Sequence, residues 1–450
     1  MNNLKAGFAR LNITPMRGVP ISGYFLERFS SGNLDELEVS ALALESGKSR
    51  VVLISLDILN ISTYIVEEMR NAVVNATGIS FEGVYIHATH THTGPFIDPK
   101  RTENGKELVE EYKTFVIKRV ADVAANALDD LKDATMGYAV GQSPNVAFVR
   151  RFRMKDGSIK TNPGVNNPDI VEPVGEVDER VNVIRFKREG ADDIALLNVG
   201  NHPDTIGGDK ISADWPGFTR RFFEKATDNT KCIFFNGAQG DVNHVNVHPT
   251  KGDFNDMFVD FDDVSRGYGH ARHMGRVVAG AAMQVWDKVT YVDVDEIKAL
   301  NKTVNVPSNM PAKEDLPLAH KYSDLHLAGK DSEIPYKGMM LTTVVAEAMR
   351  MVRLENGPEF FPMTFTALKI GNIAFFGIPG EPFNGIGRGI KSSEGWDMVC
   401  PTCLTSGSEG YFPMKDAYDE GGYEARSSNF KAGVAEFIIE EGLKMLSSLR

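Results

Sequence analysis

Runs of apolar residues recur along the chain with the spacing of strands. Residues 4–14 and 38–57 are predicted strands, and within the second one residues 50–57 form a nearly continuous apolar run. Runs of this kind are typical of strands that are buried on both faces of a sheet. Three further apolar runs predict strands at 194–199, 232–235 and 372–377.

Apolar residues with helical spacing separate these strands. The first predicted helix presents its apolar face through Ile65, Met69, Ala72 and Ala76. Gly78 follows where a C-cap belongs. A second helix is predicted over 106–131 and a closing helix over 429–449, each with apolar residues on one face. Strands that alternate with helices indicate the α/β class.

The domain organisation follows from the absence of any repeat, low-complexity tract or convincing linker. Residues 1–450 are therefore predicted to form one catalytic domain. Residues 300–335 are poorer in pattern and carry four prolines among charged residues. We interpret this stretch as a lid or an excursion over the site, or as a plain surface loop, which is the commoner arrangement.

The charge and the apolar content narrow the class of protein. The formal net charge is −12, whereas a nucleic acid or an anionic membrane would call for a basic face. No run of eighteen apolar residues occurs, so no transmembrane segment is expected. The N-terminus carries no apolar signal region, which indicates a cytoplasmic protein or one whose signal peptide has been removed. The oligomeric state is not indicated.

The three cysteines are Cys232, Cys400 and Cys403. They are too few for a disulfide framework. The lone pair Cys400–Cys403 has no second pair to complete a zinc site, so we interpret it as structural.

A cluster of histidines marks the first candidate for chemistry. Three of them fall within six residues, at His87, His90 and His92. Val84 and Ile86 face one side of the preceding strand, and continued alternation would place His90 and His92 on one side until Gly94–Pro95 ends the strand. Two imidazoles on one side provide half of a metal site. The alternative is a polar strand end whose histidines bond to the backbone.

Other polar residues follow the ends of predicted strands, where open α/β sheets carry their sites. His202 follows 194–199, Asp241 and Asn243 lie in a glycine-rich turn after 232–235, and Glu381 lies in a turn after 372–377. Each has an ordinary explanation, since Asp241 suits a turn and Glu381 suits a helix N-terminus. Together, two histidines and a glutamate from separate strand ends are typical of a catalytic zinc site.

Motifs along nearly the whole chain give these candidates a family context. They are Gly7–Pro15 with Gly23–Tyr24, Thr89–Pro95, Asn201–Pro203 followed by Ser212–Gly217, Gly380–Pro382, and Tyr411 with Gly422–Ala425. In this order they resemble the catalytic domain of the neutral ceramidase family, zinc-dependent amidases that cleave the N-acyl bond of ceramide. The resemblance implies mixed β-sheets flanked by helices, with a metal site at the strand ends.

The resemblance also implies roles for individual residues. The implied zinc ligands are His90, His202, Glu381 and Tyr411. His92 matches a histidine near the scissile carbonyl, and Tyr423 matches a tyrosine that faces the substrate oxygen. For the active-site arginine we favour Arg151, with Arg150 as the alternative. The position of His87 usually holds a small residue in the family, so its role stays open.

Two departures from the family pattern bear on mechanism and substrate. Asn243 stands where the family carries a serine proposed as nucleophile, and an amide cannot form an acyl-enzyme. Metal-activated water does not need that serine. The chain also ends after its closing helix, so the immunoglobulin-like C-terminal domain of full-length ceramidases is not expected.

The function that these observations predict is zinc-dependent hydrolysis of a small-molecule or lipid N-acyl amide. Ceramide would give sphingosine and a fatty acid, while Asp241 and Asn243 orient the substrate or its neighbours. One alternative is a related zinc hydrolase of a water-soluble amide or ester. Asn243 and the expected lack of the C-terminal domain favour it, and the acidic chain offers no obvious surface for docking to lipid. The other alternative is a non-catalytic protein that has kept the metal or only the shape.

Overall fold

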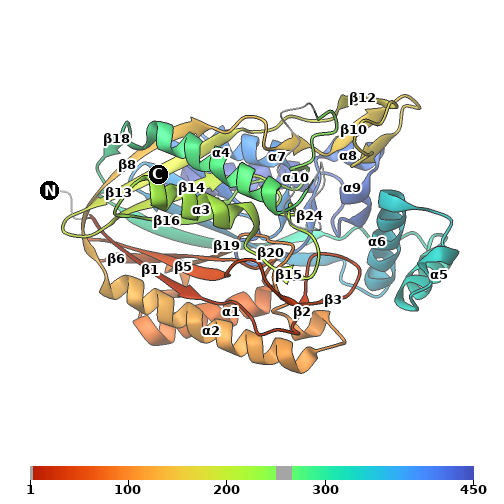
Figure 1. Ribbon diagram of the computed structural model, residues 1–450, viewed down its shortest axis with the longest axis horizontal. Helices are drawn as coiled ribbons and strands as arrows, with labels where there is room; N and C mark the ends of the chain where they lie inside the picture. The colour runs from red at the N-terminus through yellow and green to blue at the C-terminus, as the bar shows by residue number, and fades with distance from the viewer. Residues whose placement is uncertain (1–3, 250–265) are drawn as a thin grey trace.

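Two β-sheets pack face to face at the centre of the computed structural model, which describes residues 4–249 and 266–450 (Figure 1). In the described residues, nine strands form the larger sheet: β16 (Thr230–Asn236), β14 (Asp193–Val199), β13 (Arg180–Arg188), β8 (Lys132–Gln142), β1 (Leu4–Asn12), β5 (Glu38–Ser46), β6 (Ser49–Leu56) and β7 (Val84–Ala88), with β18 (Thr290–Val292) beside β8. The smaller sheet has the order β19 (Ile297–Pro307), β20 (Phe360–Ile370), β21 (Ile373–Gly377) and β23 (Met398–Thr402).

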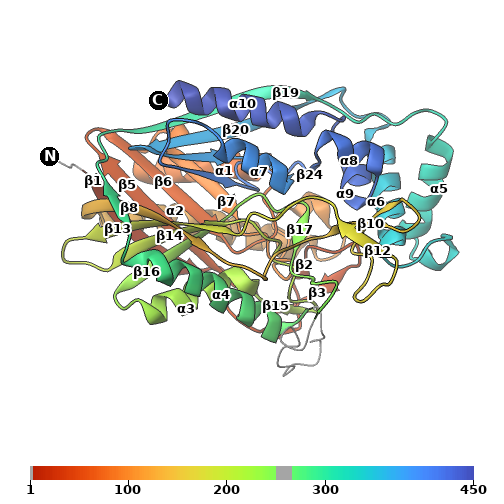
Figure 2. The ribbon, with the colours of Figure 1, turned by 90° about the horizontal axis from the view of Figure 1, so that it is seen from above.

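Helices cover the outer faces of both sheets (Figure 2). The larger sheet packs against α1 (Thr63–Thr77), α2 (Lys106–Asp129), α3 (Asp214–Ala226) and α4 (Tyr268–Trp286). The smaller sheet packs against α7 (Asn384–Lys391) and α10 (Val434–Leu449). The remaining helices are α5 (Leu316–Leu327), α6 (Gly338–Leu354), α8 (Lys415–Glu420) and α9 (Tyr423–Ser427). The order of layers is therefore helix, sheet, sheet, helix.

The loops at one end of the two sheets contain short strands that pair with one another. They are β2 (Pro20–Ile21), β3 (Arg28–Phe29), β4 (Gly32–Asn33), β9 (Phe148–Val149), β10 (Arg151–Met154), β11 (Ile159–Thr161), β12 (Ile170–Pro173), β15 (Lys210–Ile211), β17 (Val242–Asn243), β22 (Glu381–Pro382) and β24 (Tyr411–Phe412). The pairs β6/β7, β14/β16 and β21/β23 are parallel, and most other neighbours are antiparallel. The expected α/β class with mixed sheets and flanking helices is confirmed.

The near-continuous apolar runs reflect burial on both sides. In β6, Val52 and Ile54 pack towards α1 and α2, whereas Val51 and Leu53 pack into the layer between the two sheets. Successive strand residues point to opposite faces, so a strand with both faces covered needs apolar residues at every position.

Several predicted boundaries differ from the observed ones. The span 38–57 is a hairpin of two strands, and the closing helix begins only at Val434, after Gly433 with a left-handed φ of 98°. Gly78 is the αL C-cap of α1, as expected. The stretch 300–335 is not a plain loop, because it contains the end of β19 and the whole of α5, which packs on α6.

His87 links the two edge strands of the larger sheet. Its Nε2 accepts the backbone N–H of Asn236 in β16 at 3.0 Å, and its Nδ1 lies 3.2 Å from the Ser55 hydroxyl. Ser55 in turn donates to the carbonyl of Phe234 at 2.6 Å. Burial lowers the pKa of His87 to about 3, so the ring is neutral and can both donate and accept. The role left open by the sequence is therefore structural.

Cys232, Cys400 and Cys403 are buried and free, which supports their structural interpretation. Among the helices of the described residues, none is both long enough and apolar enough to cross a membrane.

Candidate metal centre

The loop after β7 brings two histidines together by a turn. β7 ends at Ala88, and His90 adopts a left-handed φ of 79°. The expectation that extended backbone continues to His92 is therefore wrong. The Nε2 atoms of His90 and His92 nevertheless lie 3.3 Å apart, with the rings nearly perpendicular at 86°. The left-handed residue, rather than strand alternation, places both rings at one centre.

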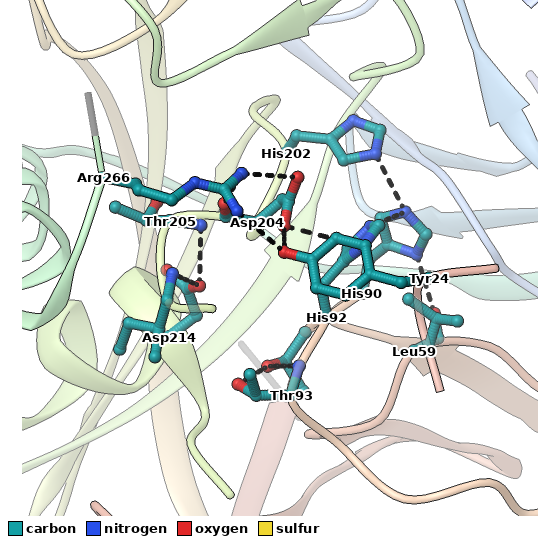
Figure 3. Close-up of polar contacts among 12 residues, drawn as sticks. Tyr24, Leu59, His90, His92, Thr93, His202, Asp204, Thr205, Asp214 and Arg266 are labelled. Carbon is teal, nitrogen blue, oxygen red and sulfur yellow. Dashed lines mark hydrogen bonds and ion pairs between the residues drawn. The ribbon is translucent and has the colours of Figure 1, made fainter. Parts of the chain in front are cut away.

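The loop after β14 adds His202 to this centre (Figure 3). The Nε2 atoms of His90 and His202 are 3.2 Å apart, and the Nδ1 atom of each ring faces a backbone carbonyl. Those carbonyls belong to Leu59, at 2.8 Å, and Gln239, at 3.0 Å. Since each Nδ1 donates its proton to a carbonyl, each Nε2 presents a lone pair to the other. Burial, together with the charge of Arg150, holds the pKa of His202 well below its usual range.

Glu381 supplies a carboxylate to the same centre. It lies in β22, and its Oε2 atom is 3.3 Å from Nε2 of His90 and 3.5 Å from Nε2 of His202. This buried oxygen accepts no hydrogen bond from the described residues. Burial by itself would raise the pKa of Glu381, but its interactions with His90 and with the guanidinium of Arg150 lower this pKa to about 2. An ionised, unpartnered carboxylate faces two nitrogen lone pairs.

These spacings fit a metal ion. Ligand atoms bound tetrahedrally to zinc at 2.0–2.1 Å are roughly 3.3–3.4 Å apart. The three separations among His90, His202 and Glu381 range from 3.2 to 3.5 Å. Mutually facing lone pairs and a carboxylate would repel one another without a cation. His90, His92 and His202 form a group that could hold a metal ion, with ligand atoms within 4.8 Å of one another.

The glycine-rich turn after β16 joins the two sides of the centre. The carbonyl of Gln239 holds His202, and the N–H of Gly240 donates to the carbonyl of Pro382 at 2.8 Å. A Cβ atom on Gly240 would lie 2.5 Å from the carbonyl oxygen of Glu381. Only glycine permits this approach. The turn therefore sets the separation between His202 and Glu381.

Tyr411 and an arginine complete the neighbourhood of Glu381. Tyr411 lies in β24 and pairs with Glu381 across parallel strands. The guanidinium of Arg150 lies 5.3 Å from the Tyr411 ring centroid and bonds Glu424 at 2.6 Å. Arg151 instead pairs with Glu420 at 2.9 Å. Arg150 is therefore the arginine that contacts Tyr411, whereas the sequence resemblance favoured Arg151 for the active site; the choice between the two for that role stays a prediction.

Burial and neighbouring charges determine whether Arg150, Tyr411 and Tyr423 carry a proton. Burial alone would lower the pKa of Arg150, but Tyr411 and Glu424 raise it, so the guanidinium stays cationic. Burial and the charge of Glu381 raise the pKa of Tyr411 and of Tyr423, whose rings are 5.6 Å apart. Both phenols are therefore protonated at neutral pH unless a cation binds beside them.

Asp241 and Asn243 serve the scaffold of the turn. Oδ1 of Asp241 accepts the first backbone N–H of α7, from Asn384, at 2.6 Å. The amide of Asn243 donates to Asn162 at 2.9 Å and accepts the N–H of Val245 at 3.0 Å. The role of Asp241 and Asn243 in orienting a substrate stays a prediction.

Asp241 should make stability fall between about pH 4 and pH 6. Burial raises its pKa to about 6, against about 3.9 in an unfolded chain. Because the folded chain binds this proton more tightly, ionisation destabilises the fold over that interval and has no further effect above it. The D241N variant lacks this titration. Denaturant unfolding of the two proteins from pH 4 to pH 7 should show D241N gaining about 3 kcal/mol relative to the wild type; a pH-independent difference would contradict the assignment.

Sequence reasoning missed several residues at the centre. Gln239 holds a histidine through its backbone, so its side-chain identity carries no signal for this role. Glu424 is fully buried against Arg150. Asp204 lies two residues after His202, and Tyr24 lies in a quoted motif, yet only folding brings them to His92.

The fold and the site together indicate the class of protein that this chain resembles. The chain has the fold of the neutral ceramidases, with a potential metal-binding cluster of histidines at the strand ends. The solved neutral ceramidase from Pseudomonas aeruginosa superposes with a TM-score of 0.73, over 100% of this chain and 75% of that one, at 16% sequence identity. A ceramidase complexed with C2 gives a TM-score of 0.73 over 100% and 76% of the two chains, at 15% identity. No protein-family model and no curated protein matches the sequence.

Proposed function

We propose that this chain is a zinc-dependent amidohydrolase that cleaves the N-acyl bond of a ceramide-like lipid, giving an amine and a fatty acid. The observation that carries the proposal is the convergence of two imidazole lone pairs and the Glu381 carboxylate at tetrahedral spacings. The fold shared with neutral ceramidases supports it.

The ligands that we propose are His90, His202, Glu381 and Tyr411. Each histidine donates its Nδ1 proton to a backbone carbonyl, the arrangement that orients metal-binding imidazoles. The cationic Arg150 beside Tyr411 would compensate the negative charge of a coordinating phenolate. A bound zinc ion would polarise the substrate carbonyl and lower the pKa of a coordinated water to about 7.

Tyr423 and Arg150 are suited to stabilise the oxygen of the scissile amide. Burial raises the pKa of Tyr423 and this phenol is not among the proposed ligands, so it keeps its proton and can donate a hydrogen bond. Arg150 brings a permanent positive charge. Preorganised groups of this kind lower the barrier by about 3–4 kcal/mol each. They replace the stabilisation that water would otherwise supply.

His92 is the group that we propose to move the proton. Burial lowers its pKa to about 4, so the ring is neutral and can accept a proton from the attacking water. It can then return the proton to the leaving nitrogen, which must become an amine. Because Asn243 has no nucleophilic oxygen, we propose direct attack by water without an acyl-enzyme.

An exposed aromatic ring near Tyr423, followed in the chain by an exposed leucine, suits an acyl chain. The ring of Phe25 lies 6.5 Å from that of Tyr423 and 6.2 Å from that of His326 in α5. Phe25 is 42% exposed and Leu26 is 70% exposed. Solvent-accessible apolar groups beside the centre favour a lipid amide over the water-soluble amide or ester. They also give no support to a non-catalytic role.

Metal removal tests the proposal. The purified protein is expected to hydrolyse a fluorescent N-acyl-sphingosine, to lose that turnover on treatment with a zinc chelator, and to regain it when zinc is added. Metal analysis should give about one zinc per chain, as a single tetrahedral site predicts. Turnover that survives removal of all zinc would contradict the proposed mechanism. A zinc-loaded protein that ignores this lipid but cleaves soluble amides or esters would establish the first alternative.

A further inference from the structure

A second polar cluster lies beside His92, on the side away from His90. It consists of Tyr24, Asp204 and Arg266, and we call it the Asp204 cluster (Figure 3). The hydroxyl of Tyr24 donates to Oδ1 of Asp204, and Nη2 of Arg266 lies 3.3 Å from Oδ2. The carboxylate is thus oriented by two partners. None of these residues is among the proposed zinc ligands.

The imidazole of His92 lies between this cluster and the metal centre. Its Nε2 is 3.3 Å from Nε2 of His90, whereas its Nδ1 lies 3.8 Å from Oδ1 of Asp204. Nδ1 is buried and has no hydrogen-bond partner among the described residues. The nearest negative charge that it faces is Asp204. Catalytic hydrogen bonds are commonly long before a substrate binds and shorten when it does.

Backbone contacts fix the segments that carry these two side chains. The N–H of His92 donates to the carbonyl of Pro203 at 3.1 Å, directly before Asp204. Arg28 donates to the carbonyl of His92 at 2.8 Å and to that of Ser22 at 2.6 Å. These hydrogen bonds hold the backbone of His92 beside the backbone that precedes Asp204.

Asp214 holds the other end of the Asp204 segment. Its carboxylate accepts the backbone N–H groups of Thr205 and Ile206, each at 2.9 Å. Asp214 is fully buried and adopts a left-handed φ of 55° at the start of α3. The motif that contains Asp214 thus anchors the chain immediately after Asp204.

We propose that Asp204 is a positioning residue that holds His92 in the tautomer with the proton on Nδ1. The Nε2 lone pair of His92 then faces the centre formed with His90 and His202. His90 and His202 obtain the same tautomer from backbone carbonyls, and the Nε2 atoms of His92 and His202 each lie 3.2–3.3 Å from Nε2 of His90. The structural part of this inference stands alone, and its catalytic consequence rests on the proposed function.

Replacing the carboxylate of Asp204 by an amide would remove the preference for one tautomer of His92. An amide at position 204 can donate to Nδ1 as well as accept from it, so it no longer selects one tautomer. In serine proteases the same exchange behind a catalytic histidine lowers kcat by about 10⁴-fold while the geometry stays intact. The contact here is longer. We therefore expect a loss nearer to 100-fold, the lower end of what acid–base catalysis supplies.

The test uses the D204N variant and the tautomer of His92 in the intact, metal-free chain. Nitrogen NMR of ¹⁵N-histidine-labelled protein distinguishes protonated from unprotonated ring nitrogens, and the H92Q variant assigns the resonances. The wild type is expected to carry the His92 proton on Nδ1, and D204N is expected to shift the population towards Nε2. In the zinc-loaded enzyme, kcat should fall about 100-fold with little change in KM or in zinc content.

D209N is the matched control, because Asp209 is an exposed carboxylate on the same segment. It should leave the tautomer and kcat unchanged. An unaltered His92 tautomer in D204N would overturn the inference, even if that variant were less stable. A changed tautomer in a protein that hydrolyses no amide would uphold the positioning role and refute the proposed function. The two failures are therefore distinguishable.

Discussion

The E381A variant is expected to bind no zinc and to lose hydrolysis by about a thousandfold or more. Oε2 of Glu381 lies 3.3 and 3.5 Å from the two histidine nitrogens and has no other partner among the described residues. Its removal leaves the proposed zinc site without one of its four ligands. Lewis-acid catalysis supplies several kcal/mol of transition-state stabilisation, and each 1.4 kcal/mol is about tenfold in rate. Zinc analysis of the purified variant and turnover of the lipid amide measure the two losses.

E394A is the control for this substitution, because Glu394 is exposed in the turn that follows α7. It should retain both zinc and activity. The fold of E381A is expected to survive, since the neighbouring imidazoles no longer face a buried negative charge. An E381A protein that is folded, active and free of zinc would refute the assignment of Glu381 as a ligand.

The R150M variant is expected to be both unstable and inactive. The side chain of Glu424 is fully buried, and its Oε1 lies 2.6 Å from Nε of Arg150. Removing the guanidinium leaves that carboxylate without its counter-charge, which typically costs about 3–5 kcal/mol of folding free energy. The loss of positive charge beside Tyr411 should lower kcat by about 100-fold or more. Denaturant unfolding and steady-state kinetics on the soluble fraction give the two effects.

A double variant separates the two roles of Arg150. R150M/E424Q removes the unpaired charge, so it should regain much of the stability, while its kcat stays low because the guanidinium is still missing. R151M is the matched control, since Arg151 pairs with Glu420, whose side chain is 23% exposed. Its expected cost is about 1 kcal/mol. If R151M lost activity while the double variant recovered it, Arg151 would be the active-site arginine.

Some features of the fold could be predicted because they depend on local pattern. The buried strands appear as apolar runs, since β6 and β14 have both faces covered. Gly78 ends α1 because glycine adopts the αL conformation without strain. The extra helix α5 was missed, because Pro317 and the prolines and charges that precede it resemble a loop, and because its apolar face is defined only by packing against α6.

The candidate site was predicted in part for a similar reason. Residues at strand ends meet at the edge of a sheet, so His90, His202 and Glu381 could be grouped from their sequence positions alone. The reason given for His90 and His92 was wrong, because a left-handed residue replaces the expected strand. The choice between Arg150 and Arg151 could not be made from adjacent positions in one motif.

From the sequence alone we could recognise the α/β class, the candidate ligands and the motifs that resemble those of neutral ceramidases. Those properties depend on residue type and spacing. Three features are visible only in the folded chain: how the ligand atoms converge, which arginine contacts Tyr411, and the position of Asp204 opposite His92. These contacts join residues more than a hundred positions apart in the chain, and backbone turns such as the one at Gly240 bring the strand ends together. Packing, rather than local sequence, fixes such distances.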